Sequence, residues 1–428
     1  MPYRSGESGE LGGGGFPATR ISPGSLRLDL MIHRLNPHIM QAQEGYNRRL
    51  GGYLKDSDYI RRSADPDVID LAFGDPHEMP SRKLVECLQR HLHPKHVGWF
   101  AYARGYGPAQ DIIAKSLSNE LNMPIESNDI LMTNGAFGGL MVCLRSVCAP
   151  GDEVIYLNPA WFYYESMIMS IGARPVPVST IPGEWNLDIA RIKASITERT
   201  SAIIVNSPNN PTGVVYSVQQ LQDLADVLTS AAGRYGNPIY LLSDESYRRI
   251  VFDDGKFTSP IMYYPYSFLV YTYTKSLLIP AERVGYVALT SMMPCRDTVR
   301  DALSVAQLMT GWSFPNSSLM YAVSELESLT IPLDPLVQRR DLFVESFRAM
   351  GYTVEPNQGT FYLLVRAPIA NDRAYAEAVA RNKVLVLPGA IMGAAGYFRV
   401  SLTVTDRMAK EALPRFLRAD SYLRSVQA

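Results

Sequence analysis

Cysteine is scarce in this chain, which has four in 428 residues and no Cys-x-x-Cys pair. A disulfide scaffold or a cysteine-rich zinc module needs closely spaced cysteines, so both classes are excluded. Scattered single cysteines are typical of buried free thiols in a reducing compartment. The sequence therefore predicts a cytoplasmic protein without disulfides.

The chain also lacks an excess of either charge and any long apolar run. Its 41 Lys and Arg residues face 42 Asp and Glu residues, for a net charge of -1. A balanced charge argues against nucleic acid or an anionic membrane as a partner. No run reaches the length that spans a bilayer, and the glycine-rich segment 1–26 has no apolar stretch of the kind found in signal peptides. We expect 1–26 to be a flexible tail.

Histidine is confined to the first 96 residues, where His91, His93 and His96 lie close together. Such spacing occurs in metal sites, but a solvated helix end beside Pro94 explains it better, and we predict no metal. Gly105-Tyr106-Gly107 does not follow a strand, so we reject a dinucleotide-binding loop.

From residue 129 onward, apolar strands alternate with helices. Strands are expected at 130–133, 153–157, 201–206, 238–243 and 268–272, and a long helical stretch at about 316–350. This alternation predicts an α/β fold whose large domain has a mostly parallel sheet between helices. A smaller α/β domain is expected from both chain ends, with limits at 27–75 and 321–428 around a large domain at 76–320.

Lys275 is the most informative residue. It follows an apolar, aromatic run, and Arg283 comes eight residues later. Burial removes water from a charged amine, and the neutral amine that results can attack a carbonyl to form a Schiff base. Arg283 and the hydroxyl of Thr272 are suited to the phosphate of a carbonyl cofactor. A solvated surface lysine is the alternative.

Two strand–helix junctions carry further cofactor-like residues. Gly135, Ala136 and Phe137 begin a predicted helix, whose backbone amides suit an anion. Trp161 follows Pro159 in a turn and is suited to stacking on a planar ring, although a core tryptophan has the same signature.

Polar residues follow two of the buried strands. Asn210 belongs to the rigid turn Asn206–Gly213, where its side chain is suited to a phenolate oxygen. Asp244 ends a strand, and a buried carboxylate there needs a cation such as a protonated pyridine nitrogen. A helix N-cap is the alternative for Asp244. Tyr247 follows at a spacing that reaches the same ring.

Arg399 is a lone cation within the apolar strand 397–402. Its guanidinium is suited to two-pronged binding of an amino acid carboxylate. A structural ion pair is the alternative.

Together these motifs resemble the class I/II aminotransferases, which are the aspartate-aminotransferase-like pyridoxal-phosphate enzymes of fold type I. The resemblance rests on Asn210-Pro211-Thr212-Gly213, on Asp244-x-x-Tyr247 and on Lys275 with Arg283, and it covers about residues 30–420. It implies a sheet of the seven-stranded type and pyridoxal 5'-phosphate as the cofactor.

The resemblance also assigns roles by position. Lys275, Asp244 and Tyr247 are the catalytic residues, and Lys275 forms the Schiff base. The cofactor is held by Gly135, Ala136, Phe137, Trp161, Asn210, Asp244, Tyr247, Thr272, Lys275, Arg283 and Tyr102, the last reaching the partner's cofactor in a homodimer with shared active sites. Gly74, Asn210 and Arg399 bind the substrate.

The implied activity is transfer of an amino group between an L-amino acid and a 2-oxo acid. Elimination, cyclisation, decarboxylation or oxidation of an amino acid in the same site is the alternative. The chain departs from the family at Thr272 and Thr274, where serines are usual, and at His77 and Met392, which bear on the substrate. Tyr102, Trp161 and Trp312 favour an apolar or aromatic substrate side chain.

Overall fold

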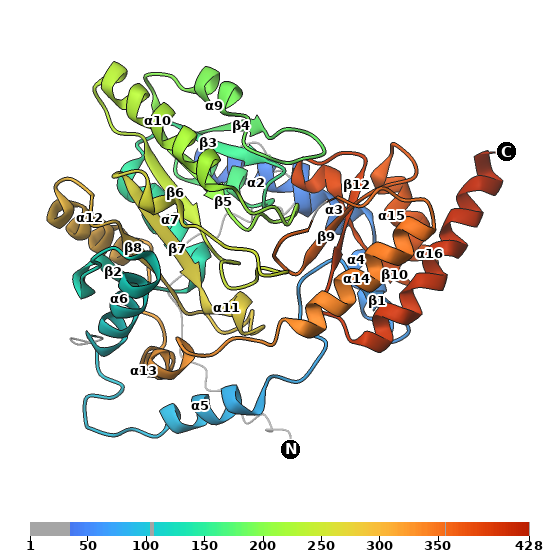
Figure 1. Ribbon diagram of the computed structural model, residues 1–428, viewed down its shortest axis with the longest axis horizontal. Helices are drawn as coiled ribbons and strands as arrows, with labels where there is room; N and C mark the ends of the chain where they lie inside the picture. The colour runs from blue at the N-terminus through green and yellow to red at the C-terminus, as the bar shows by residue number, and fades with distance from the viewer. Residues whose placement is uncertain (1–34, 103–106, 356, 428) are drawn as a thin grey trace, which may run out of the picture.

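The computed structural model describes residues 35–102, 107–355 and 357–427 (Figure 1). The predicted tail 1–26 lies outside these ranges, so that prediction is not tested.

A seven-stranded sheet forms the larger part of the molecule, as predicted. Its order is β2 (Ile130–Thr133), β8 (Gly285–Leu289), β7 (Ser267–Thr272), β6 (Tyr240–Asp244), β5 (Thr200–Asn206), β3 (Glu153–Asn158) and β4 (Arg174–Ser179). β8 runs in the direction opposite to the other six strands of this sheet. β4 and β8 were not predicted from the sequence. Pro175 and Pro177 hide β4, which tolerates proline because it lies at the sheet edge.

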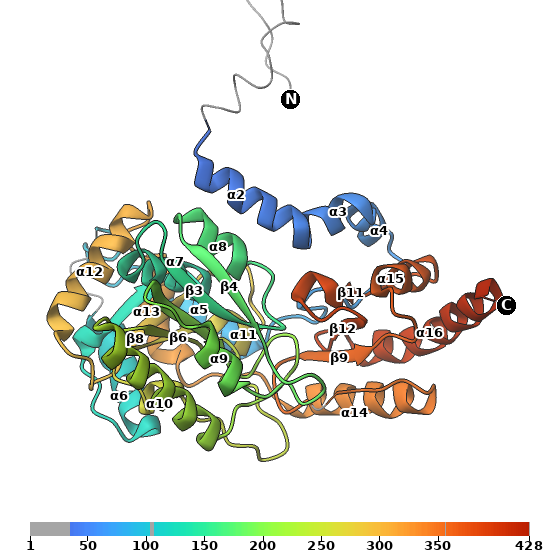
Figure 2. The same ribbon diagram turned by 90° about the horizontal axis from the view of Figure 1, so that it is seen from above.

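Helices cover both faces of this sheet (Figures 1 and 2). Consecutive residues of β5 point to opposite faces of the sheet and contact different helix layers. Ile204 packs in the cluster with α7, and Ile203 packs in the cluster with α10. The elements around the sheet are α5 (Arg82–Leu92), α6 (Gly107–Leu121), η2 (Ser127–Asp129), α7 (Gly135–Val147), α8 (Tyr164–Ser170), α9 (Ile189–Ser195), α10 (Val218–Tyr235), η3 (Pro260–Met262), α11 (Tyr273–Ser276), α12 (Arg296–Met309) and α13 (Ser317–Leu326).

Helix α10 illustrates how local sequence sets these elements. Ser217 caps its first turn and exchanges hydrogen bonds with Gln220, while Gly236 takes the left-handed conformation just past its end. Leu221, Leu224 and Leu228 recur on one face and are buried against the sheet.

Both ends of the described chain build the smaller unit, as Figures 1 and 2 show. The parallel pair β1 (Ile69–Asp70) and β10 (Val384–Leu385) joins them, and Arg62 pairs with Glu377. The antiparallel sheet of this unit has the order β11 (Leu387–Pro388), β12 (Tyr397–Ser401) and β9 (Tyr362–Arg366). The remaining elements of this unit are η1 (Asn47–Gly51), α3 (Gly52–Asp56), α4 (Tyr59–Ser63), α14 (Asp334–Ala349), α15 (Asp372–Arg381), η4 (Gly389–Met392) and α16 (Asp406–Gln427). Helix α2 (Pro37–Tyr46), which precedes them, packs against α8 of the larger unit (Figure 2).

The helical stretch predicted at 316–350 is two helices, α13 and α14, separated at 327–333. Helix α13 packs with α5 and α6 around Leu319 and Val323, whereas α14 packs in the smaller unit around Phe343. The chain passes from the larger to the smaller unit between these two helices. The exact domain limits stay a prediction.

Two further expectations from the sequence concern the cysteines and membrane-spanning helices. None of the four cysteines is in a disulfide, and Cys87 and Cys143 are buried as expected. Cys295 is exposed and Cys148 half-buried, so the expectation of burial is wrong there. Within the described ranges, no helix combines the length and the apolar character needed to cross a membrane.

Candidate active site

The carboxyl ends of three neighbouring strands place polar residues at one edge of the large sheet. Asn206 ends β5, Asp244 ends β6 and Thr272 ends β7. Ligands of open parallel sheets bind beyond this edge. Here it borders a cavity of about 250 Å³ that also reaches β12 of the smaller unit. The cavity is lined by most of the residues predicted from the sequence, namely Gly74, Ala136, Phe137, Trp161, Asn210, Asp244, Tyr247, Thr272, Lys275, Arg283 and Arg399.

Lys275 lies on α11, the single turn of helix that follows β7. Its side chain is half-buried rather than enclosed, because it lines the cavity. The amine Nζ lies 5.7 Å from the ring centre of Phe361. Burial raises the pKa of Asp244, and the positive charge of Lys275 opposes part of that rise. The predicted anchor is thus a lysine open to the cavity and close to a buried carboxylate.

Asp244 is buried and held from two sides. Its Oδ2 accepts a 2.5 Å hydrogen bond from the hydroxyl of Tyr164, and Oδ1 accepts a 2.6 Å bond from the hydroxyl of Ser246. Burial raises the pKa of this carboxyl, while these hydrogen bonds oppose the rise. No helix begins at Asp244, so the helix N-cap alternative is wrong. A buried carboxylate facing a cavity suits a cationic ring nitrogen.

An anion cradle, formed by Thr272, Thr274, Arg283 and the start of α7, lines the same cavity as this carboxylate. Thr272 and Thr274 bring their hydroxyls to 3.0 Å of one another, and Arg283 lines the same space. Gly135 begins α7 with φ of +73°, and a Cβ there would meet the Arg283 guanidinium and the Thr272 hydroxyl at 3.1 Å. Glycine keeps this position open, and the first amides of α7 add partial positive charge.

Arg399 is buried without a carboxylate partner among the described residues. Its Nη1 donates a 2.8 Å hydrogen bond to Oδ1 of Asn210, and Nη2 donates one of 2.7 Å to the carbonyl of Ala72. Its Nε has no partner, and its guanidinium stacks 3.7 Å above the ring centre of Tyr362. Burial lowers the pKa of Arg399. The structural ion pair considered as an alternative is absent from the described residues, and the guanidinium keeps donor capacity for an anion.

Tyr362 lies next to both Gly74 and Tyr247. A Cβ on Gly74 would lie 2.5 Å from the Tyr362 hydroxyl and 2.4 Å from the Phe361 ring, so the backbone approaches here only as glycine. Tyr247 is buried, and its pKa is raised well above the usual value by burial and by Tyr362.

Trp161 lines the cavity and packs edge-on against Phe137, with ring centres 5.1 Å apart. Tyr164, Ser246 and Tyr362 also belong to the site and were not predicted from the sequence. Tyr164 falls three residues after Trp161 and gave no separate signal, because many buried tyrosines look alike in sequence.

Tyr102 does not line the cavity and is 97% exposed in the single chain. The exposed side chains of Val97 and Phe100 lie just before it in the chain. The role predicted for Tyr102 needs a second subunit, so it stays a prediction.

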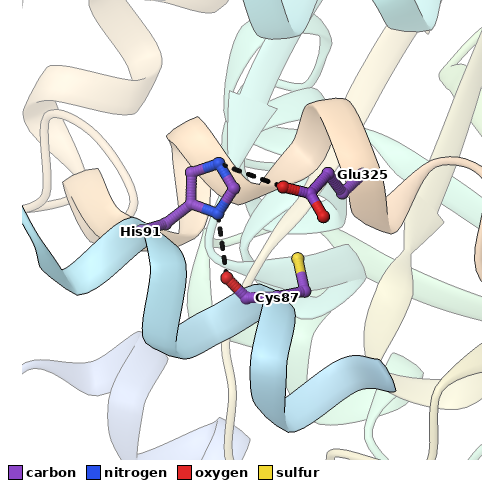
Figure 3. Close-up of side chains that lie close together, drawn as sticks. All are labelled: Cys87, His91 and Glu325. Carbon is purple, nitrogen blue, oxygen red and sulfur yellow. Dashed lines mark hydrogen bonds and ion pairs between the residues drawn. The ribbon is translucent and has the colours of Figure 1, made fainter. Parts of the chain in front are cut away.

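A second cluster joins α5 to α13 away from the cavity (Figure 3). Nδ1 of His91 bonds the Cys87 carbonyl at 2.9 Å, and Nε2 lies 3.7 Å from Oε1 of Glu325. His93 and His96 are exposed as predicted, but His91 is buried between the helices, which corrects its assignment to a solvated helix end. Glu325 is already paired with Arg90, so its charge is neutralised within the contact. We interpret the cluster as a polar helix–helix contact, and the absence of a metal stays a prediction.

Comparison with known proteins agrees with this geometry. Residues 66–416 match the family described as aminotransferase class I and II. The aspartate/prephenate aminotransferase of Thermus thermophilus is 29% identical over 363 residues, covering 82% of this chain and 91% of the relative. A probable aspartate/prephenate aminotransferase of Aquifex aeolicus is 28% identical over 385 residues, covering 84% and 92%.

Solved structures show the same likeness. An aminotransferase from Eubacterium rectale superimposes with a TM-score of 0.80 at 26% identity, covering 92% of this chain and 98% of that one. An aspartate aminotransferase of Thermus thermophilus with maleate gives a TM-score of 0.76 at 26% identity, covering 90% and 99%. The predicted fold and the predicted aminotransferase activity are confirmed by these matches. This chain belongs to the class I and II aminotransferases.

Proposed function

We propose that this aminotransferase uses pyridoxal 5'-phosphate, held covalently by Lys275, to move an amino group between an L-amino acid and a 2-oxo acid. One observation carries the proposal. The Lys275 side chain, the buried Asp244 carboxylate and the Arg399 guanidinium line one cavity with the anion cradle. Lys275 matches the carbonyl of the cofactor, Asp244 matches its ring nitrogen and the anion cradle matches its phosphate. Arg399 matches the carboxylate of a substrate.

The bound cofactor supplies an electron sink for the bond electrons at the substrate's Cα. Asp244 would keep a proton on the ring nitrogen, and the hydroxyls of Tyr164 and Ser246 orient its two oxygens. Lys275 would hold the cofactor's carbonyl carbon, and its amine would be the base that moves the proton of the substrate's Cα. Its place on the short helix α11, directly after β7, keeps the amine at the sheet edge.

Phosphate binding is assigned to the anion cradle. Thr272, Thr274 and Arg283 supply side-chain donors, and the N-terminus of α7 supplies backbone amides. The gap left at Gly135 supports this assignment, because a side chain there would fill the space between Thr272 and Arg283.

Substrate orientation is assigned to Arg399. Asn210 and the Ala72 carbonyl fix its guanidinium from two sides and leave Nε without a partner. A substrate α-carboxylate would complete the hydrogen bonding of this buried cation.

We further propose a homodimer that shares its active sites, as is implied by the family, with Tyr102 reaching the partner's phosphate group. The exposure of Val97, Phe100 and Tyr102 supports a contact surface there. The free thiols support a reducing compartment, for which we propose the cytoplasm.

The test is covalent labelling followed by a half-reaction. Borohydride reduction of the purified enzyme with the cofactor is expected to place the label on the peptide containing Lys275. Lys275→Ala should abolish both the label and the reaction, whereas Lys193→Ala, an exposed lysine on α9, should change neither.

The outcome of the half-reaction separates transamination from other chemistry. An added amino acid should convert the bound cofactor to its amine form and release one 2-oxo acid per site. Release of ammonia or consumption of oxygen in place of that exchange would contradict the proposal.

A further inference from the structure

We infer that this site selects substrates with an uncharged apolar side chain, aromatic ones above all, and disfavours dicarboxylates. The inference rests on the proposed function and names its substrate class. It departs from what the names of the relatives state, since those proteins are aspartate or aspartate/prephenate aminotransferases.

The charges around the cavity support this selection. Three cations line the described cavity, and each already has a task, namely Lys275 with the carbonyl, Arg283 with the phosphate and Arg399 with the α-carboxylate. Asp75 is the one charged lining residue without a task, and it is acidic. A second substrate carboxylate would therefore lose water without gaining a cation among the described residues of its own subunit, which is costly in a partly enclosed site.

Aromatic rings line the same cavity as Gly74, the glycine assigned to the substrate. Phe73, Phe137 and Phe162, here called the aromatic wall, all line the cavity. Phe73 and Phe162 meet edge to face with ring centres 6.5 Å apart. Phe137 stays 37% exposed, and Phe162 is almost fully buried. A phenyl or branched alkyl group placed here would bury apolar surface against rings and gain edge-to-face contacts.

The loop that follows β1 connects the aromatic wall to Arg399, the residue assigned to the substrate carboxylate. The Phe73 ring packs edge-on against Tyr59 at 5.2 Å, and the Tyr59 hydroxyl donates to Asp70. Asp70 Oδ1 accepts from the amide of Ala72 at 2.8 Å, and the Ala72 carbonyl accepts from Arg399.

Thr403 fixes the far end of the same loop. Its hydroxyl donates a 2.7 Å hydrogen bond to the Asp75 carbonyl, and its own carbonyl accepts from the amide of His77. The wall is thereby held at a set distance from the guanidinium that would bind the α-carboxylate, as side-chain selection requires.

Equilibrium binding tests the inference without turnover. The holoenzyme is titrated with 3-phenylpropionate and with maleate, two unreactive carboxylates, and the dissociation constants are compared by calorimetry. We expect 3-phenylpropionate to bind about 30-fold more tightly or better, since one apolar group in a fitted pocket changes selection by ~10–200-fold. Equal or tighter binding of maleate would overturn the inference.

Single-turnover kinetics provides the second test. Holoenzyme is mixed with phenylalanine, leucine, alanine, aspartate or glutamate, and the rate of the cofactor's absorbance change is measured. Phenylalanine should exceed aspartate by about 100-fold in apparent second-order rate constant. Reaction with aspartate at a similar or higher rate would overturn the substrate class and leave the aminotransferase proposal standing. No reaction with any amino acid would overturn both.

A wall variant links the selection to its residues. Phe73→Ala should lower the ratio of the phenylalanine rate to the alanine rate by about 10-fold, because the loss falls on the larger side chain. Leu417→Ala, a half-exposed position on α16, should leave that ratio unchanged. An unchanged ratio in a folded Phe73→Ala enzyme would contradict the assignment of the wall.

Discussion

Tyr164 donates a 2.5 Å hydrogen bond to Asp244, which lies 80 residues away in the chain. Tyr164 begins α8 after β3, and Asp244 ends β6, so the parallel sheet brings the two together. Tyr164 is fully enclosed, and its pKa is raised far above the usual value by burial and by the nearby Asp244 charge. It therefore keeps its own proton and donates a hydrogen bond to the carboxylate at neutral pH.

Tyr164→Phe should shift the acid side of the activity profile upward. Burial raises the pKa of Asp244, and the bonds from Ser246 and Tyr164 oppose that rise. Without the Tyr164 bond the carboxylate accepts a proton at higher pH, so its pairing with the cofactor ring is lost at higher pH. A bond to a charged group contributes ~1.5–3 kcal/mol, so kcat should fall about 10-fold or more.

The measurement is kcat/KM against pH for both enzymes, with Tyr163→Phe, a half-buried neighbour, as the control. A uniform loss at all pH values, with no shift of the acid limb, would show that Tyr164 acts through packing alone.

Arg399→Lys should raise KM far more than it lowers cofactor affinity. Lysine cannot reproduce the fork that contacts Asn210 and Ala72 together, and it cannot stack on Tyr362 in the same way. We expect kcat/KM for the amino acid to fall about 100-fold or more, in line with loss of a charge-assisted pair. Spectroscopic titration with the cofactor should give a dissociation constant within about 3-fold of the wild type. Equal losses in both quantities would contradict the carboxylate role.

Cavity residues could be predicted from the sequence where they stand at or just after the end of an apolar strand. Asn210, Asp244 and Lys275 each follow an apolar strand, and the carboxyl ends of parallel strands meet at one edge. Contacts between distant segments carry no local signal. The link from Ala72 to Arg399 spans 327 residues, and it is invisible without the fold.

Sheet edges and contacts between helices account for the remaining differences between the predictions and the structure. β4 carries two prolines because an edge strand leaves one side unpaired, so its pattern did not indicate a strand. His91 occupies the buried face of α5, and only the position of α13 explains that burial.

Mixing two inactive variants should restore activity if the sites are shared. Lys275→Ala and Tyr102→Ala subunits are denatured together and refolded with the cofactor. Only a mixed dimer has a site with Lys275 from one subunit and Tyr102 from the other. With random pairing, about a quarter of wild-type sites should be recovered. Size-exclusion chromatography checks that the dimer forms. Recovery no greater than the sum of the separate variants would place Tyr102 outside the partner's site.

Glu153→Gln should destabilise the sheet at neutral pH and do so less in acid. Glu153 begins β3 with its side chain almost fully buried, and it pairs with Arg174 on the neighbouring strand β4. Burial alone would raise the pKa of Glu153, but the hydrogen bonds from Arg174 and Thr197 outweigh it, and the pKa lies below the ordinary 4.5. The folded state therefore binds this proton less readily than the unfolded state, and the pairing stabilises the fold above pH 4.5.

That stabilisation is lost as pH falls from 4.5 through the lowered pKa of the folded state. At pH 7 the variant should lose about 2 kcal/mol of unfolding free energy, the size of one buried bond to a charged group. The gap from the wild type should narrow as the pH falls below 4.5 and the wild-type carboxylate takes up its proton. Urea unfolding at fixed protein concentration measures both values, with Glu198→Gln, an exposed neighbour, as the control. A gap that stays constant with pH would mean that Glu153 stabilises the strand by shape and neutral hydrogen bonds rather than by its charge.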